Sequence, residues 1–224
     1  MSASSQSNPV HPDAARDAAD ISTAVVESAA PQHIWSFKPP PFETVQCIPK
    51  KERSQIFGFA VLEASAVAHE PLANGGNHWT FYLTATPNPL DLSERRLIQL
   101  DSTPSGTTAG SGSSGSKANI VISLLEDRDF SRAHCICRQH TRDSLTVGDF
   151  VNAVTEYGRD KYDFDERGRG CKRWTADQMD LFLNLGLFVE EDDVRDAKNH
   201  MMFQWDGFQR IGDHSEWAVG PYYE

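Results

Sequence analysis

Apolar residues occur in short runs through the first half of the chain and recur at helical spacing in the second half. Five runs rich in Ile, Val, Leu, Phe and Tyr are separated by Gly, Pro and Asn, a pattern that is typical of β-strands. They lie at Ile56 to Val67, Trp79 to Thr84, Arg95 to Asp101, Asn119 to Leu125 and Arg132 to Gln139. These runs predict a meander of about five antiparallel strands.

Three helices are predicted after the strands. The first begins with a capping-box pattern at Thr146 and Asp149, ends at Gly158, and has one apolar face made of Val147, Phe150, Val151, Val154 and Tyr157. The second runs from Gly170-Cys171 to Gly186, with Trp174, Gln178, Leu181, Phe182 and Leu185 at spacings of three or four. The third begins near Asp192, with a stripe of Val194, Ala197, Met201 and Trp205. Strands followed by helices predict an α+β fold in which about three C-terminal helices cover one face of an antiparallel sheet.

Composition divides the chain into a tail and a single domain. Residues 1–32 are rich in Ala, Ser, Asp and Pro and are predicted to be a disordered tail. Residues 33–224 are predicted to form one α+β domain, with a flexible Gly/Ser-rich insertion at 102–117. No apolar run is long enough to cross a membrane and no secretory signal is visible, so we expect a cytoplasmic protein that has no membrane partner.

Charge and cysteine content narrow the classes of function. The net charge of -11 argues against a protein that coats nucleic acid nonspecifically. The four cysteines are too few and too unevenly spread for a disulfide framework, and we expect them to be thiols. His134, Cys135, Cys137 and His140 are residue types that bind zinc, but the sequence offers no second ligand pair, so we favour a structural role and expect no metal and no cofactor.

Cys171 and His78 are the candidate catalytic pair. A cysteine at a helix start lies beside unpaired backbone N–H groups and the positive end of the helix dipole, which favour the thiolate. His78, at the edge of a predicted strand, is suited to take and return its proton, and Gln99 or Asp101 on the neighbouring strand is suited to orient the imidazole. The competing interpretation is that Cys171 is a small buried residue and His78 an ordinary strand-end residue.

Two resemblances rest on these residues. Over residues 56–186, His78-Trp79 with Tyr82-Leu83, followed by Cys171 at a helix start, resembles the circularly permuted papain-like fold of lecithin:retinol acyltransferase and its relatives. That resemblance implies acyl transfer through a thioester. The chain also resembles the fungal arginine-containing cyclodipeptide synthases, through His78-Trp79, Tyr162-Asp163-Phe164, Gly170-Cys171-Lys172-Arg173-Trp174 and Trp205.

The second resemblance implies arginyl-tRNA as one substrate and a second aminoacyl-tRNA as the other, with a diketopiperazine as the product of secondary metabolism. The family's DDxxE motif corresponds to Asp192, Asp193 and Asp196, where the chain ends the motif in Asp. These carboxylates are suited to bind a guanidinium, although acidic residues in the first turn of a helix are also stabilised by its dipole without any ligand.

Further residues are predicted to bind substrate. Trp79, Trp174, Lys172 and Arg173 flank the candidate pair, and a local basic patch for tRNA is predicted from Lys161, Arg167, Arg169, Lys172 and Arg173. The alternatives are a Cys-His hydrolase or another acyltransferase, and a noncatalytic binding protein.

Overall fold

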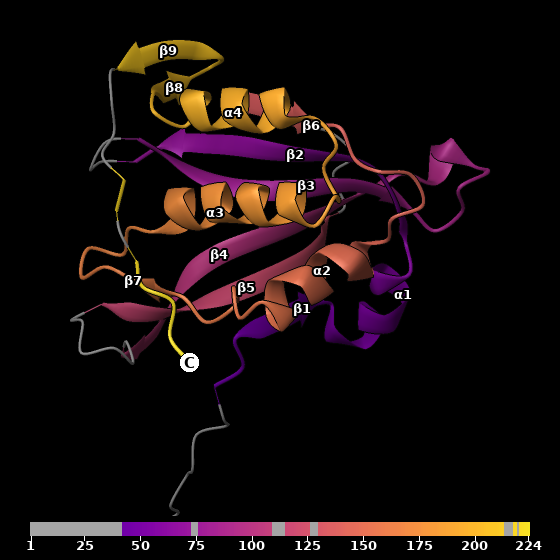
Figure 1. Ribbon diagram of the computed structural model, residues 1–224, viewed down its shortest axis with the longest axis horizontal. Coiled ribbons are helices and arrows are strands. Elements are labelled where there is room, and N and C mark those ends of the chain that lie inside the picture. The colour runs from indigo at the N-terminus through magenta and orange to yellow at the C-terminus, as the bar shows by residue number, and fades with distance from the viewer. Residues whose placement is uncertain (1–41, 73–75, 109–114, 126–129, 213–216, 219) are drawn as a thin grey trace, which may run out of the picture. The chain divides into compact units, whose positions relative to one another are not determined.

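The computed structural model describes residues 42–72, 76–108, 115–125, 130–212, 217–218 and 220–224 (Figure 1). The predicted tail at 1–32 lies outside them. The strands are β1 (Val45–Ile48), β2 (Ala60–Pro71), β3 (Asn77–Thr86), β4 (Arg96–Thr108), β5 (Ser116–Leu125), β6 (Cys135–Gln139), β7 (Asp163–Phe164), β8 (Gln204–Asp206) and β9 (Gln209–Gly212). The helices are α1 (Arg53–Phe57), α2 (Val147–Glu156), α3 (Cys171–Asn184) and α4 (Glu191–His200), with short 3-10 helices at Lys50–Glu52 and Leu92–Glu94.

The fold is α+β, as predicted, but the sheet is mixed. Seven strands form it in the order β1-β5-β4-β3-β2-β6, with β7 paired to β5, and β8 and β9 form a separate hairpin. The five predicted strands form antiparallel pairs, as predicted. β1 adds one parallel pair with β5, and β7 pairs antiparallel with β5, so the sheet is mixed and has two strands more than predicted. The strands that were not predicted, β1, β7, β8 and β9, are two to four residues long, too short to show a pattern.

Three further predictions needed correction. Ile56 belongs to α1, where it is fully buried, and the predicted strand starts at Ala60. Much of the predicted insertion at 102–117 is strand: β4 continues to Thr108 and β5 begins at Ser116, because main-chain pairing needs no large side chains. Trp205 lies in β8 and not in the third helix.

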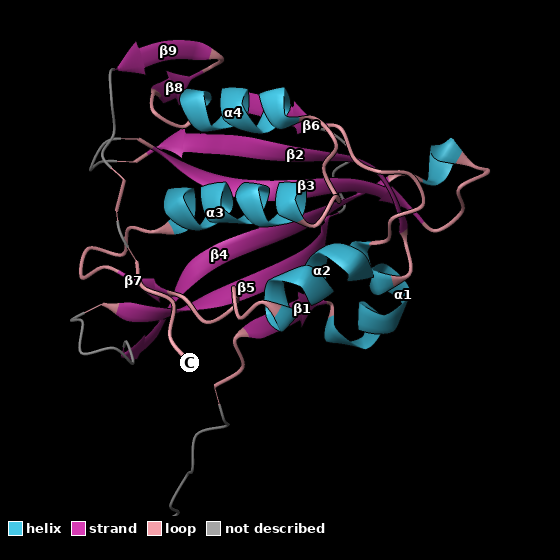
Figure 2. Cartoon of the chain, viewed as in Figure 1, coloured by secondary structure: helices cyan, strands magenta, loops and turns pink. Residues whose placement is uncertain are grey.

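The predicted helices α2 and α3 are confirmed in place and extent. Thr146 and Asp149 form the capping box of α2, in which Thr146 Oγ1 accepts from the Asp149 N–H and the Asp149 carboxylate accepts from the Thr146 N–H. After α3 the chain turns at Gly186, whose φ of 68° favours glycine. These two helices and α4 lie over one face of the sheet (Figures 1 and 2). No helix among the described residues has the length and apolar character needed to cross a bilayer.

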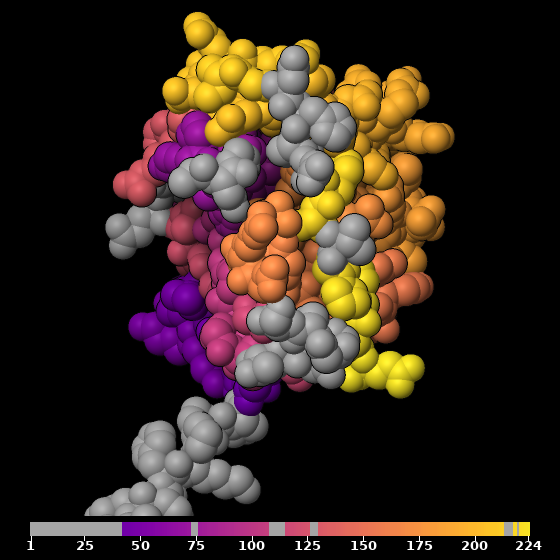
Figure 3. All heavy atoms as spheres, turned by 90° about the vertical axis from the view of Figure 1, so that its left-hand side faces the viewer, coloured from indigo at the N-terminus to yellow at the C-terminus, as the bar shows by residue number. Residues whose placement is uncertain are grey.

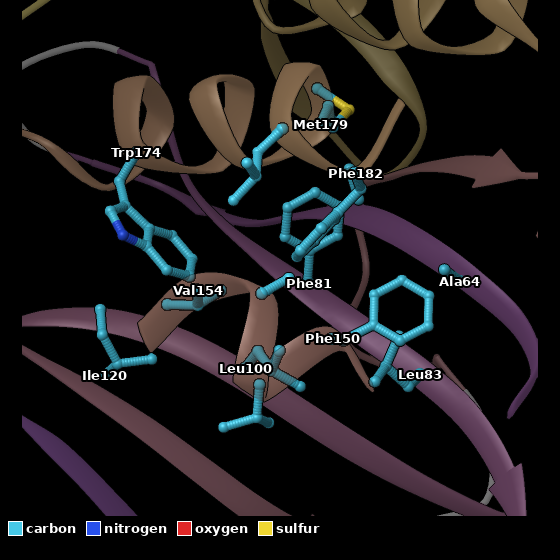
Figure 4. Packing of buried hydrophobic residues seen from close by; sticks show 14 of the residues in the cluster. Ala64, Phe81, Leu83, Leu100, Ile120, Phe150, Val154, Trp174, Met179 and Phe182 are labelled. Atoms are coloured by element: carbon cyan, nitrogen blue, oxygen red, sulfur yellow. The ribbon is translucent and has the colours of Figure 1, made fainter. Parts of the chain in front are cut away.

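The main core lies between the sheet and this layer of helices. Trp174, Met179 and Phe182 of α3 point toward Phe81 and Leu100 of the sheet (Figure 4). We call this side of the sheet the helix face. A smaller apolar cluster of Val67, Tyr82, Leu97 and Ala133 includes strand positions that alternate with those of the main core and therefore lies on the opposite side, which we call the outer face.

Candidate active site

β3 and β4 separate at the end of the sheet where α3 begins. Their pairing runs from Ala85↔Arg96 only as far as Phe81↔Leu100. β2 stays paired with β3 as far as Asn77, and β5 stays paired with β4 as far as Thr108. The register therefore leaves the first residues of β3 without β4 as a neighbour.

The first turns of α3 bind β3 in this interval. The Trp79 N–H donates to the sulfur of Cys171, and the Trp79 carbonyl accepts from Thr175 Oγ1 at 3.1 Å. Cys171 and Thr175 are four residues apart and so lie on the same side of α3. Two successive turns of α3 are thus hydrogen-bonded to Trp79. These bonds fix α3 against β3 directly beside His78.

Cys171, His78 and Asp101 form a connected triad at this point. His78 Nε2 lies 2.8 Å from Asp101 Oδ1, and the His78 ring is also hydrogen-bonded to the Cys171 side chain. Because Nε2 is used by Asp101, Nδ1 is the ring nitrogen left for the thiol. The side chains of His78 and Asp101 are 28% and 17% exposed, and Cys171 is 7% exposed. The predicted contact between Cys171 and His78 is confirmed.

The surroundings of the pair favour a thiolate and an imidazolium. Burial favours neutral His78, but its hydrogen bonds to Asp101 and Cys171 outweigh that effect and raise the pKa of His78 to about 10. Burial likewise disfavours the Cys171 thiolate, but the hydrogen bond and charge of His78, with the Trp79 N–H, outweigh it and lower the pKa of Cys171. Between these two pKa values, the site holds a nucleophilic sulfur anion beside a proton donor.

The start of α3 adds hydrogen-bond donors to this site. Gly170 is the N-cap residue and no side chain caps the helix. The backbone N–H groups of the first turn have no partner in a regular helix, and they carry the positive end of the dipole. Glycine is required at the cap because a Cβ on Gly170 would lie 2.8 Å from Tyr162 Cε1. The Gly-Cys sequence thus lets α3 start tightly against Tyr162 with Cys171 in its first turn.

The C-terminal residues pack beside this helix start. The backbone of Tyr222 forms an isolated antiparallel β-bridge with Tyr162. The Tyr222 hydroxyl donates to Asp177 Oδ2 at 3.1 Å. Figure 3 shows the last residues of the chain, in yellow, against the orange segment that contains these helices. The aromatic-rich C-terminus therefore packs onto the domain.

Of the two residues predicted to orient His78, the structure places Asp101 in contact. Gln99 lies two residues earlier on β4, pairs with Tyr82 on β3 and faces a pocket on the outer face. The other residues predicted to bind substrate are buried, are paired with neighbouring side chains, or lie away from Cys171. The indoles of Trp79 and Trp174 are fully buried in the main core, so neither is available to a substrate.

Two of the five cations in the predicted basic patch form ion pairs, and a third is buried. Arg169 pairs with Asp165, and Arg173 pairs with Asp177, both at 2.8 Å. Lys172 is buried, with its Nζ 4.8 Å from the centroid of the Trp217 ring. Burial lowers the pKa of Lys172 to about 8, so part of its charge is lost near neutral pH.

The acidic cluster lies away from Cys171. Asp193 Oδ2 accepts from the His140 N–H at 3.1 Å and contacts His140 Nδ1 at 2.6 Å. His140 follows the strand position paired with Ala64, whereas Cys171 contacts the strand beside Ala68, four residues away along β2 and so roughly 14 Å distant. Asp192 pairs with Arg195. These carboxylates therefore have partners within the chain and are not placed beside the nucleophile.

Replacing Asp193 with Asn is expected to reduce stability in a pH-dependent way. The hydrogen bond that the His140 ring donates to the Asp193 carboxylate raises the pKa of His140 above its ordinary value. Such a group adds stability below its unfolded-state pKa of about 6.5, and the contribution disappears as the pH rises through the folded-state pKa. Asp193→Asn should therefore lower the urea midpoint more at about pH 5.5 than at about pH 9. Asp192→Asn, in the same helical turn, is the control, and an equal loss at both pH values would contradict the role of His140.

The cysteines of β6 show no metal-site geometry. Cys135 Sγ and Cys137 Sγ lie 3.9 Å apart on one side of the strand, and all four cysteines of the chain are free. Among the residues that the structure describes, no group of three or more His, Cys, Asp or Glu side chains is arranged to hold a metal ion.

Thr175 is the positioning residue that sequence reasoning missed. It is fully buried and carries the hydrogen bond to Trp79 described above. Its spacing of four from Cys171 is visible in the sequence, but its partner on β3 is not.

Thr175→Val is expected to leave the Trp79 carbonyl buried without a partner, at a cost of about 1–3 kcal/mol, and to raise the pKa of Cys171 as α3 loosens. Urea unfolding and the pH dependence of Cys171 alkylation measure the two effects. Thr175→Ser keeps the hydroxyl and should restore the thiol pKa, whereas an unchanged alkylation profile in the Val variant would limit Thr175 to a role in stability.

Comparison with known proteins gives one match. A family model described as a domain of unknown function (DUF7770) matches residues 64–223. The matched region contains all three members of the triad. No curated protein and no solved structure matches the chain.

Proposed function

The chain belongs to the DUF7770 family, a domain of unknown function, and from the geometry of its own residues we propose that it is a thiol-dependent acyl-transfer enzyme. Cys171 is the nucleophile, His78 the general base and acid, and Asp101 the residue that orients the imidazole. The observation that carries the proposal is the hydrogen-bonded series Cys171–His78–Asp101 at the start of α3. A merely buried cysteine has no need of a histidine held by a carboxylate.

In the acylation step, the Cys171 thiolate attacks the carbonyl carbon of an activated acyl donor such as an ester or thioester. A carbon–sulfur bond forms and the carbonyl electrons move to oxygen. When the tetrahedral intermediate collapses, the bond to the leaving group breaks and the His78 imidazolium gives its proton to that group. The products are a thioester on Cys171, a neutral His78 and the protonated leaving group.

The first turn of α3 is suited to stabilise the oxyanion formed in this step. The backbone N–H groups of this turn and the positive end of the helix dipole lie at Cys171, where negative charge develops on the carbonyl oxygen. In the deacylation step, an acceptor attacks the thioester, its proton passes to His78, and the thiolate leaves. The thiolate–imidazolium pair is thereby restored without a cofactor.

The arginine-containing cyclodipeptide synthase is a particular member of this reaction class and stays a prediction. Aminoacyl esters of tRNA are activated acyl donors, so the same thioester chemistry would apply to arginyl-tRNA and a second aminoacyl-tRNA. A cytoplasmic location, predicted from the sequence, would keep the thiol reduced. The papain-like permutation also stays a prediction, and the order His78 before Cys171 is compatible with it.

The direct test uses p-nitrophenyl acetate as a generic acyl donor. The proposal predicts a rapid burst of about one p-nitrophenolate per chain, with the acetyl group found on Cys171 by peptide mass spectrometry. A chain that is folded by circular dichroism but shows no burst, or that is acetylated on another cysteine, would overturn the proposal. Arginyl-tRNA supplied as donor then tests the narrower prediction, through thioester formation on Cys171.

A further inference from the structure

The outer face of the sheet carries the base of the triad. On β3, Trp79 and Phe81 point into the main core, so His78 and Tyr82 alternate to the outer face. On β4, Leu100 points into the main core, so Asp101 points outward with Gln99. Cys171 belongs to the helix that covers the other face. The nucleophile and the base thus meet from opposite sides of the sheet, where β3 and β4 separate.

A pocket of about 290 Å³ lies on the outer face of the sheet, beside His69. Its wall includes His69 of β2, Tyr82 of β3, Gln99 of β4, and Phe130 with Arg132 of the segment that precedes β6. The His69 and His78 rings are 6.0 Å apart between centroids. His69 thus separates the pocket from the His78 imidazole, which lies on the same face of the sheet. Its volume is at the lower end for ligand sites and suits a small molecule.

The inner wall of the pocket offers neutral hydrogen-bonding groups. Tyr82 Oη lies 3.1 Å from His69 Nε2. Burial, with the nearby charge of His78, lowers the pKa of His69, and burial raises the pKa of Tyr82 to about 12, so both side chains are neutral at pH 7. Phe130 stacks edge-to-face on Tyr82 with 5.4 Å between centroids and closes an apolar side.

Charges of both signs lie at the pocket wall. Arg132 and Glu70 both line it, and the positive charge of Arg132 acts on Glu70 and Tyr82. Among the described residues, no acidic side chain lies within ion-pairing distance of Arg132. A guanidinium in this state is suited to bind a carboxylate with two parallel hydrogen bonds.

We propose that this pocket binds the acyl acceptor and that the acceptor is a small amine that carries a carboxylate, such as an α-amino acid. The inference rests on the proposed function. A general base must lie within hydrogen-bond reach of the proton it removes, so the amine of an acceptor in this pocket must extend past His69 to His78. Arg132 holds the carboxylate, Gln99 and Tyr82 donate hydrogen bonds, and Glu70 disfavours acceptors with further negative charge.

The transfer step balances with the residues named. The neutral amine nitrogen attacks the carbonyl carbon of the Cys171 thioester and forms a carbon–nitrogen bond. Its proton passes to neutral His78, and the carbon–sulfur bond breaks with the electron pair left on sulfur. The products are an amide and the restored thiolate–imidazolium pair, with no oxidant, reductant or nucleotide consumed.

The test measures how acetyl-Cys171, formed from p-nitrophenyl acetate, is deacylated by L-alanine and by L-alaninamide, which lacks the carboxylate. Compared at equal concentrations of free amine, alanine should accelerate deacylation with saturation and yield N-acetylalanine, whereas alaninamide should act weakly and without saturation. Arg132→Gln should raise the half-saturating alanine concentration about tenfold or more and leave the burst unchanged. Arg138→Gln, which removes an exposed cation paired with Glu63, is the matched control.

The outcomes separate the two proposals. Absence of the burst in the wild-type chain defeats the acyl-transfer function itself. A normal burst followed by equal, nonsaturating effects of alanine and alaninamide overturns the acceptor site and leaves the function standing. An Arg132→Gln variant that keeps both the burst and the wild-type response to alanine also overturns it. The comparison of the two amines needs no variant, so a poorly folded Arg132→Gln chain does not remove the test.

Discussion

Replacing Cys171 with Ala is expected to abolish the burst of p-nitrophenolate from p-nitrophenyl acetate. No other side chain in the triad can form the thioester, because His78 is bonded to Asp101 and serves as base. The variant should remain folded, since the change removes one buried sulfur atom beside Trp79 and leaves the bond from Thr175 to Trp79 in place. Burst amplitude by stopped-flow absorbance and the urea midpoint measure the two properties.

Cys135→Ala is the matched control for this experiment. Cys135 is also a buried, free thiol in contact with the main core, but it lies on β6 with Cys137 as its sulfur neighbour. The control should keep a full burst. A burst that survives in Cys171→Ala and is lost in Cys135→Ala would place the reactive thiol on β6 and contradict the mechanism above.

Replacing His78 with Gln is expected to slow alkylation of Cys171 by iodoacetamide at pH 7 by about thirtyfold or more. A thiol with the ordinary pKa of about 8.5 is only about 3% ionised at pH 7, whereas a thiol paired with an imidazolium is generally mostly thiolate at that pH. Burial of Cys171 pushes in the same direction once the imidazolium is gone, because burial raises a thiol pKa. Gln keeps an N–H donor for Asp101, so the carboxylate is not left without a partner.

His200→Gln is the control, since His200 lies at the end of α4 and contacts Trp205 and the Asp196 carbonyl. Alkylation is followed at Cys171 by peptide mass spectrometry, because the chain has four free cysteines. If His78→Gln and His200→Gln both react at the wild-type rate, the thiol does not owe its ionisation to His78.

The sequence predicted the elements that have a strong local pattern. The apolar faces and end signals of α2 and α3 were sufficient, because Thr146, Gly158 and Gly186 mark helix ends by chemistry that acts within a few residues. β1 and β7 were missed because their pairing with β5 depends on distant parts of the chain. Trp205 continued a helical spacing, yet the chain leaves α4 before it and β8 pairs with β9.

The triad was predictable in part for the same reason. A cysteine after glycine at a helix start and a histidine at a strand edge are local features, and their contact was confirmed. The choice between Gln99 and Asp101 was not local, because it depends on where β4 stops pairing with β3. The acidic residues of α4 had a clear pattern in the sequence. That pattern does not show that Asp193 is hydrogen-bonded to His140, at a distance from Cys171.

One structural feature joins these results. If β3 and β4 stayed paired past Phe81, β4 would take the backbone groups of Trp79 and block Cys171 from His78. The separation of the two strands therefore creates the site. α3 stabilises it by making the hydrogen bonds to the Trp79 backbone that β4 does not make.

The pH dependence of Cys171 alkylation in the wild-type chain tests the thiolate–imidazolium pair most directly. Iodoacetamide modification, followed at the Cys171 peptide, should already be fast below neutral pH and should stay nearly constant until the pair loses its shared proton near the His78 pKa of about 10. A rate that instead rises steadily with pH and reaches half its maximum at or above about 8.5, as for an isolated thiol, would contradict the pair and the mechanism built on it.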